Sequence, residues 1–282
     1  MSVLQLAIEI TRTAGALVAR FYDQGVASVQ VKSSAVDLVT EADLASQAWV
    51  VEALGRHFPE HGIWAEESAH ARPATDTYWL LDPLDGTTNF AHGYPVFAVT
   101  LALVSHGVVQ LGVTYDVVRA RSYWAARGEG AWCDGQRLQV SARHVLQQTL
   151  LATGFPYSRA TNPDNNLAEF NFFMPRCQGV RRAGSAALDL AWVAEGNLDG
   201  YWESYLNPWD CAAGVLLVTE AGGSVSDFDG QPWQLGGQRL LASNGQPALH
   251  AALVDGLAEA RRGASWLWGN ESTMPGWRHD RP

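Results

Sequence analysis

The segment 78–90 constrains the fold more than any other part of this 282-residue chain. It begins with four large apolar residues, Tyr78 to Leu81, which indicate a buried β-strand. The apolar run ends abruptly at Asp82 and Pro83, and a proline cannot continue a central strand because it lacks the backbone N–H. The sequence therefore predicts a strand that ends at Asp82 on a sharp corner.

Two carboxylates lie at this corner, and a row of backbone amides follows them. Asp82 and Asp85 are three residues apart, and the Gly-Thr-Thr run at 86–88 reads as the first turn of a short helix. Carboxylates suit a hard divalent ion and helix N-terminal amides suit a phosphate, so we predict metal-assisted chemistry on a phosphate. Phosphatases with an aspartyl nucleophile are excluded, because their two acids flank one residue and Pro83 stands in the place of the first acid.

The composition is that of a globular protein and argues against a nucleic-acid partner. Apolar residues make up 47% of the chain, charged residues 17%, and the net charge is −10, whereas DNA and RNA binding depends on Lys and Arg. The three cysteines have no paired spacing, which predicts a reducing compartment and excludes a Cys-based zinc site. We recognise no signal peptide and no apolar run of bilayer length, so we expect a cytoplasmic protein without membrane contact.

The hydrophobic periodicity changes in the middle of the chain. Before residue 146 it predicts an α+β half with two helices, over 2–22 and 40–58, and strands over 61–65, 78–81, 96–104, 108–115, 121–126 and 136–140. From 146 to 264 strands and helices alternate, with strands over 149–152, 180–182 and 198–203 and helices over 164–174, 185–194, 208–221 and 247–261. We therefore expect fold class α/β, with halves 1–145 and 146–264 and a Trp-rich tail, 265–282.

Further acidic residues fall at the ends of predicted elements. Alone, Asp43 reads as a helix cap, Asp210 as an acid at a helix N-terminus, and Glu66 with Glu67 as a solvated pair. The group at 82–87 is different, because acids, proline and glycine occur together at the end of an apolar strand.

Longer motifs make the chain resemble the inositol monophosphatase family. They are DPLDGTTNF at 82–90, WDCAAG at 209–214, EAGG at 220–223, EES at 66–68, an N-terminal loop at 32–43, and GSAA at 184–187 with YWE at 201–203. Their order and length are specific, and the likeness runs from residue 3 to about 260. The resemblance implies a layered α/β/α/β/α sandwich of the sugar-phosphatase type.

The resemblance also implies a set of site residues. Two or three Mg²⁺ ions would be bound by Glu66, Asp82, the Leu84 carbonyl, Asp85 and Asp210. The attacking water would be oriented and deprotonated by Asp43 and Thr87. The phosphate would be held by the amides of Gly86 and Thr87, and the alcohol by Gly184, Ser185, Ala186 and Glu203.

The activity implied is Mg²⁺-dependent, lithium-sensitive hydrolysis of myo-inositol monophosphate by a homodimer. Alternatives from the same fold act on histidinol phosphate, fructose 1,6-bisphosphate or phosphoadenosine phosphate, and another is a non-catalytic partner of the transcription machinery. The Thr-Asn-Phe ending at 88–90 favours the inositol branch, and the lack of a basic cluster near the motifs argues against bisphosphates. All the expected metal ligands are present, which favours an enzyme. The segment 203–208, beside the expected alcohol pocket, departs from the family's pattern.

Overall fold

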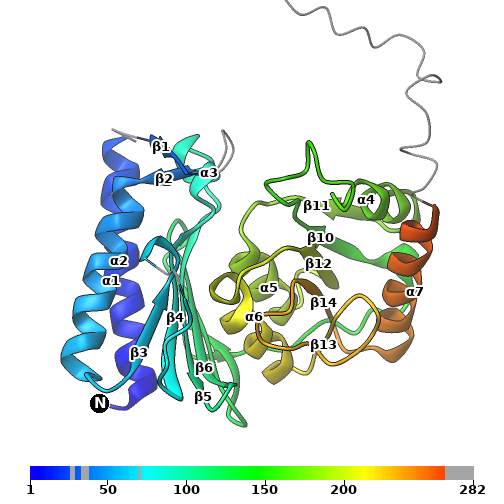
Figure 1. Ribbon diagram of the computed structural model, residues 1–282. Coiled ribbons are helices and arrows are strands. Elements are labelled where there is room, and N and C mark those ends of the chain that lie inside the picture. The colour runs from blue at the N-terminus through cyan, green and yellow to red at the C-terminus, as the bar shows by residue number, and fades with distance from the viewer. Residues whose placement is uncertain (26–28, 33–37, 69–70, 264–282) are drawn as a thin grey trace, which may run out of the picture.

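The chain folds into five layers (Figure 1). The computed structural model describes residues 1–25, 29–32, 38–68 and 71–263. Helices α1 (Val3–Gln24) and α2 (Glu41–His57) cover one face of a seven-stranded sheet, and α5 (Ala186–Ala194) and α6 (Pro208–Glu220) separate it from a five-stranded sheet. Helices α4 (Leu167–Phe173) and α7 (Pro247–Gly263) cover the far face of the second sheet, so the expected α/β/α/β/α sandwich is confirmed.

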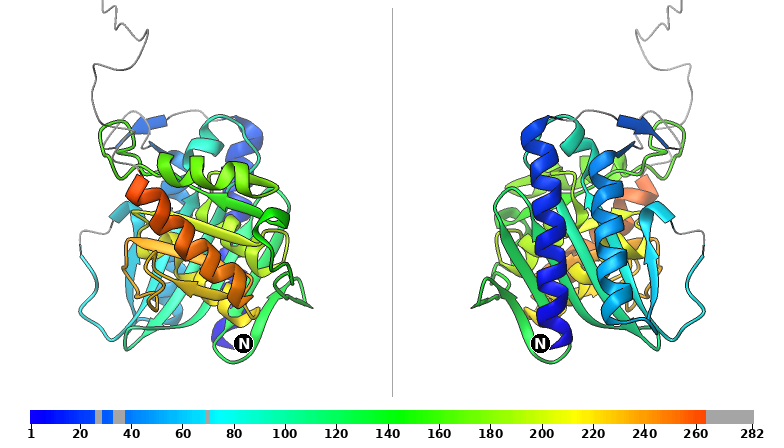
Figure 2. Two further views of the ribbon diagram at one scale, coloured as in Figure 1. Left: turned by 90° about the vertical axis from the view of Figure 1, so that its right-hand side faces the viewer. Right: turned by 90° about the vertical axis from the view of Figure 1, so that its left-hand side faces the viewer.

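Two further views separate the outer layers. Figure 2 shows α1 and α2 side by side over the first sheet in one view and α7 with α4 over the second sheet in the other. The predicted helix 2–22 matches α1, whose Ser2 forms a capping box with Gln5. The loop residues 33–37 and the Trp-rich tail 265–282 lie outside the described residues.

The seven-stranded sheet is antiparallel except at one edge, as expected for the N-terminal half. Its strands, in sheet order, are β3 (Gly62–Ala65), β4 (Thr77–Asp85), β5 (Ala98–Ser105), β6 (Val108–Asp116), β7 (Arg121–Ala126), β8 (Gly130–Cys133) and β9 (Gln136–Arg137). Only β3 and β4 pair in parallel among these strands. The short strand β8 was not predicted, and β9 is shorter than the expected strand 136–140. A separate hairpin joins β1 (Val29–Val31) to β2 (Leu38–Thr40).

The five-stranded sheet confirms the α/β character of the second half. Its order is β11 (Gly179–Arg181), β10 (Leu150–Thr153), β12 (Gly200–Ser204), β14 (Arg239–Ser243) and β13 (Ser224–Ser226). Strand β10 runs parallel to β11 and β12, whereas β14 runs antiparallel to β12 and β13. The helix predicted over 164–174 is shorter, because α4 begins only after Asn166, which has a positive φ.

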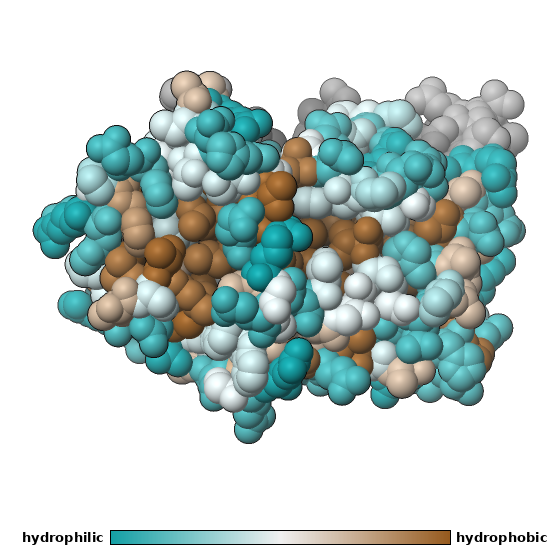
Figure 3. All heavy atoms as spheres, turned by 90° about the horizontal axis from the view of Figure 1, so that it is seen from below, coloured by the Kyte–Doolittle hydropathy of each residue, from teal (hydrophilic) through white to brown (hydrophobic). Residues whose placement is uncertain are grey.

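One apolar core joins the two sheets through α5 and α6. The same buried cluster contains Tyr78 and Tyr123 from the first sheet, Leu190 and Leu217 from the helices, and Tyr201 from the second sheet. The division at residue 145 stays a prediction, and the core crosses it. No helix in the described part of the chain is long and apolar enough to cross a bilayer. Figure 3 shows apolar residues gathered on the surface seen from below, mainly on the side of the seven-stranded sheet.

Strand β4 continues through Pro83, so the prediction that it ends at Asp82 is wrong. Asp82 pairs with Thr100 and Asp85 pairs with Ala98, so three steps on β4 oppose two steps on β5. Pro83 lies in this bulge, where a missing N–H removes no ladder bond. Residues three apart on a regular strand face opposite sides, but the extra residue turns both carboxylates to one side.

Candidate active site

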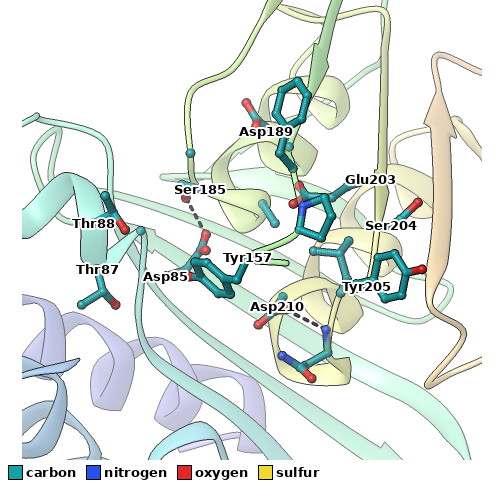
Figure 4. Close-up of a pocket in the computed structure, with 18 of the residues that line it drawn as sticks. Asp85, Thr87, Thr88, Tyr157, Ser185, Asp189, Glu203, Ser204, Tyr205 and Asp210 are labelled. Carbon is teal, nitrogen blue, oxygen red and sulfur yellow. Dashed lines mark hydrogen bonds between the residues drawn. The ribbon is translucent and has the colours of Figure 1, made fainter. Parts of the chain in front are cut away.

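A cavity of 650 Å³ opens beside the bulge of β4, between the first sheet and the elements β12, α5 and α6. Of the predicted site residues, it brings together Glu66, Asp82, Leu84, Asp85, Gly86, Thr87, Gly184, Ser185, Ala186, Glu203 and Asp210. Asp43 lies behind Thr87 and does not line the cavity. Figure 4 shows Thr87 and Thr88 on one side of the cavity and Glu203 on the other.

Asp43 caps α2 and also holds Thr87. It is fully buried, and its Oδ2 accepts a hydrogen bond of 2.8 Å from the backbone N–H of Thr40, which completes a capping box. Its Oδ1 lies 3.0 Å from the hydroxyl oxygen of Thr87, which donates toward it and toward the Leu84 carbonyl at 2.9 Å. Burial raises the pKa of Asp43. One carboxyl group therefore caps α2 with one oxygen and contacts the Thr87 hydroxyl with the other.

Three carboxyl groups reach the cavity from two elements, Asp82 and Asp85 from β4 and Asp210 from α6. Burial is the main cause that raises the pKa of Asp82, Asp85 and Asp210, and Asp85 reaches about 6. The neighbouring acids, Glu66 foremost, raise these pKa values further. Figure 4 shows Asp85 and Asp210 on two sides of the space, with the ring of Tyr157 between them in this view.

Each of these carboxyl groups is held by a backbone amide. The N–H of Leu84 donates to Asp82 Oδ1 at 2.9 Å, and the N–H of Asn207 donates to Asp210 Oδ2 at 2.7 Å. Asp85 Oδ2 accepts from the N–H of Ala187 at 2.8 Å and from the hydroxyl of Ser185. The Ser185 hydroxyl, which was expected to contact the substrate, thus donates its hydrogen bond to Asp85.

Lys32 brings a positive charge to the edge of this acidic site. Its Nζ lies 2.9 Å from Glu66 Oε1 and 2.5 Å from Glu67 Oε1. Burial raises the pKa of Glu67 to about 7, against the opposing effect of the Lys32 contact. Lys32 was noted in the sequence only as part of a motif, without a role.

The donor chemistry of the cavity suits a hard cation. Four carboxyl groups, from Glu66, Asp82, Asp85 and Asp210, line one space, and their repulsion is a cost that a bound cation would remove. In the described part of the chain, no three His, Cys, Asp or Glu side chains are placed so that they could hold a metal ion. In each group one oxygen accepts from Lys32, Ser185 or a backbone amide, and the other oxygen has no hydrogen bond among the described residues, so a cation could bind it without displacing these partners.

Gly86 shapes the side of the cavity that carries Thr87. Gly86 has φ +93°, and a Cβ there would lie 2.9 Å from the carbonyl oxygen of Val96. This conformation begins helix α3 (Thr87–Ala91), whose first amides have no partner within the helix. Asn89 donates to the carbonyls of Val96 and Ala183 at 2.7 and 2.8 Å, which ties this turn to the segment that carries Gly184.

Glu203 lies on the side of the cavity opposite Thr87 and Thr88. It accepts a hydrogen bond from the hydroxyl of Tyr201, and burial raises its pKa to about 7. A Cβ on Gly154 would lie 2.0 Å from the Glu203 carboxylate, so a larger residue there would force that carboxylate to move. The lining also includes residues that the sequence reasoning missed, namely Tyr157, Arg182 and Asp189. Tyr205 and Asn207, from the segment 203–208 that was expected beside the alcohol pocket, line the cavity as well. Asp189, an acid in an otherwise apolar helix, is the one that the sequence could have signalled.

A model of the inositol monophosphatase family matches residues 1–262. The chain belongs to the inositol monophosphatase family. It is 44% identical over 256 residues to an inositol-1-monophosphatase from Synechocystis sp., covering 90% of this chain and 88% of that protein. It is also 44% identical to a protein named Nus factor SuhB from Pseudomonas aeruginosa, covering 86% and 91% of the two chains.

A solved structure supports the same assignment. The inositol monophosphatase from Anabaena (Nostoc) sp. superimposes with a TM-score of 0.82 at 44% identity, covering 91% of this chain and 95% of that chain. As a member of the inositol monophosphatase family, the chain is a phosphatase, a hydrolase whose family acts on phosphate monoesters.

Proposed function

We propose that this chain hydrolyses myo-inositol monophosphate to inositol and phosphate with Mg²⁺ as its cofactor. The proposal is supported by one cavity that combines Glu66, Asp82, Asp85 and Asp210 with the Asp43–Thr87 pair. It is supported further by the likeness to a protein named inositol-1-monophosphatase. Glu203 at the opposite end supplies an acceptor for the hydroxyl groups of the alcohol.

The metal ligands we propose are those of the acidic cluster. Glu66, Asp82, Asp85, Asp210 and the Leu84 carbonyl would hold two or three Mg²⁺ ions. When bound, such ions neutralise charge on the phosphoryl oxygens and make coordinated water more acidic. The raised pKa values of Asp82, Asp85 and Asp210 support this role, because a cation would favour their charged forms.

The chain's own groups handle the proton and the phosphate. The Thr87 hydroxyl accepts a proton from the attacking water and passes its own to Asp43 Oδ1, along the 3.0 Å contact between them. The amides of Gly86 and Thr87 contact the phosphate oxygens. On the other side, Gly184, Ser185, Ala186 and Glu203 surround the alcohol.

An Asp210→Asn variant tests the proposal. The carbonyl oxygen of Asn can still accept from the N–H of Asn207, so the start of α6 should stay folded while one carboxylate charge is lost. We expect kcat/KM for myo-inositol 1-phosphate to fall by about a hundredfold or more, since removing a group that stabilises transition-state charge costs on this order. Phosphate release is measured with and without chelator, and Asp255→Asn on the exposed face of α7 is the matched control.

The same assay examines the substrate alternatives. The panel contains phosphates of inositol, histidinol, fructose and phosphoadenosine, and the proposal requires the highest kcat/KM for the inositol ester. Full activity of Asp210→Asn, or hydrolysis unaffected by chelator, would contradict the proposed ligand set. Inhibition by millimolar lithium, a homodimer in light scattering and a cytoplasmic location belong to the same proposal, and family membership supports them.

A second candidate is a binding function with a partner of the transcription machinery. Its support is the name Nus factor SuhB carried by relatives from Pseudomonas aeruginosa and other bacteria. The full acidic cluster favours the enzyme, because a binding role alone does not need it. Asp210→Asn separates the two roles: hydrolysis should collapse, while any partner binding should survive.

A further inference from the structure

The cavity contains a buried acid that no step of the proposed reaction uses. Asp189 on α5 lines the cavity on the alcohol side, and its side chain is 1% exposed. Figure 4 shows it on the same side as Glu203, away from Thr87 and Thr88. Its Oδ1 has no hydrogen-bond partner among the described residues. A buried carboxyl oxygen without a partner costs stability, so its presence in a cavity calls for a ligand.

The structural roles open to an acid in the first turn of α5 are already filled. Ser185 caps the helix by accepting from the N–H of Leu188 at 3.3 Å. Asp85 accepts from the N–H of Ala187 at 2.8 Å, which places a carboxylate at the same helix end. Asp189 therefore does not need to cap α5, and an exposed acid would serve the helix dipole without the cost of burial.

The charges around Asp189 favour a neutral hydrogen-bond donor over a cation. Burial raises the pKa of Asp189, Glu203 and Asp85 add to the rise, and Arg182 opposes it. Arg182 also lies near Glu203 and lines the same cavity, so it already supplies a positive charge that faces the two acids. A neutral hydroxyl group can donate to each carboxyl group without bringing a further charge into the cavity.

We propose that Asp189 is a specificity-determining residue that, together with Glu203, selects leaving alcohols with at least two further hydroxyl donors. This inference rests on the proposed phosphatase function and adds a residue that selects the leaving alcohol. A polyol gives Asp189 the partner that the protein does not, whereas an alcohol without such donors leaves the acid buried and unpaired. Sites built for a hydrogen-bond donor discriminate strongly against ligands that lack it.

The test compares three phosphate esters across four proteins. The substrates are myo-inositol 1-phosphate, histidinol phosphate and p-nitrophenyl phosphate, and the proteins are the wild type, Asp189→Leu, Asp189→Asn and Asp199→Asn. We expect Asp189→Leu to lower the ratio of kcat/KM for the inositol ester to that for the nitrophenyl ester by at least fivefold. Asp189→Asn keeps an acceptor oxygen, so its ratio should lie between that of Asp189→Leu and that of the wild type.

Thermal unfolding separates this role from a structural one. Asp199 is a buried acid outside the cavity whose carboxylate is bonded to Ser141, Arg143 and the N–H of Leu150. Asp199→Asn should lower the unfolding temperature without changing the substrate ratio, whereas Asp189→Leu should keep or raise the unfolding temperature because it removes an unpaired acid.

The inference is overturned if Asp189→Leu changes the ratio of kcat/KM for the inositol ester to that for the nitrophenyl ester by less than fivefold. It is also overturned if a fivefold loss of kcat/KM occurs for histidinol phosphate alone. If the wild type hydrolyses none of the three esters, the proposed function fails and the inference is decided by calorimetric binding of myo-inositol 1-phosphate. A loss of affinity of at least fivefold in Asp189→Leu then supports it, and a smaller loss overturns it.

Discussion

At the scale of single residues, one carboxyl group of the site, that of Asp43, makes two separate contacts. Asp43 caps α2 with one carboxyl oxygen and holds the Thr87 hydroxyl with the other. The two interpretations of this acid, cap or catalytic residue, are therefore compatible. Ser185 likewise has two roles, since its hydroxyl donates to Asp85 in the site and accepts from the N–H of Leu188 at the start of α5. A substitution at either position changes local folding and the site together.

The raised pKa values of the cavity acids lead us to expect that, in the absence of metal, the stability of the folded protein falls as pH rises. The folded-state pKa of Asp85 is about 6 and that of Glu203 about 7, both above the usual values near 4. A raised folded-state pKa means that the stabilisation is fully present below the unfolded value and is lost as pH rises through the folded value. We expect the unfolding temperature in chelator to decrease between pH 5 and pH 8.

Two comparisons check this pH dependence. Glu203→Gln should flatten the decrease, because one of the titrating groups is gone. Mg²⁺ should raise the unfolding temperature more at pH 8 than at pH 5, since it binds the charged carboxylates. An unfolding temperature that increases from pH 5 to pH 8 in chelator would show that the site acids do not dominate the pH dependence.

At the scale of elements, a glycine sets how closely α6 packs on the first sheet. Gly112 lies in β6 against α6, and a Cβ built on it would be 2.6 Å from the Cα of Ala213. The start of α6 carries Asp210, so this contact also positions a residue of the acidic cluster. Backbone atoms, unlike the end of a flexible side chain, cannot move aside cheaply.

We expect Gly112→Ala to destabilise the protein by about 1–3 kcal/mol, the usual cost of overpacking a core. The matched control is Gly55→Ala in α2, where the added Cβ meets nothing within 4 Å. That substitution should stabilise by roughly 0.5–1 kcal/mol, because alanine is the better helix former. Urea unfolding measures both, and equal effects of the two changes would rule out the close contact as the cause.

At the scale of the whole molecule, the two sheets share one core. Helices α5 and α6 come from the second half of the chain, yet α6 covers the inner face of the first sheet. The first half alone would therefore expose the apolar side chains that α6 buries, such as Tyr78 and Tyr123. Whether the halves 1–145 and 146–264 fold as separate units depends on this shared core, which the unfolding transition tests.

We expect the full chain to unfold in a single transition, because separating the halves would expose this shared core. Near-UV circular dichroism and far-UV circular dichroism should give the same midpoint in a urea titration. Separated midpoints, with the first half still folded at the end of the first transition, would show that the halves are independent domains.

The sequence by itself determined the elements and most of the site membership. Apolar periodicity located α1 and most strands of the first sheet, although not β8, and the motifs around Asp82, Asp85 and Asp210 indicated the residues that line the cavity. These features are local, since each depends on the chemistry of neighbouring residues. The motif at 82–90 combines a buried strand, two acids and a turn. It therefore indicated the type of chemistry even though the residues that it contacts elsewhere in the chain were not known.

Only the tertiary structure decided how these residues meet. The bulge at Pro83 turns Asp82 and Asp85 to one side of β4, which depends on pairing with Thr100 and Ala98 on β5. Asp189 became significant because α5 buries it in the cavity without a partner for Oδ1, a fact absent from its sequence neighbours. Strand register and burial arise from contacts between distant segments, and for that physical reason the sequence alone left them open.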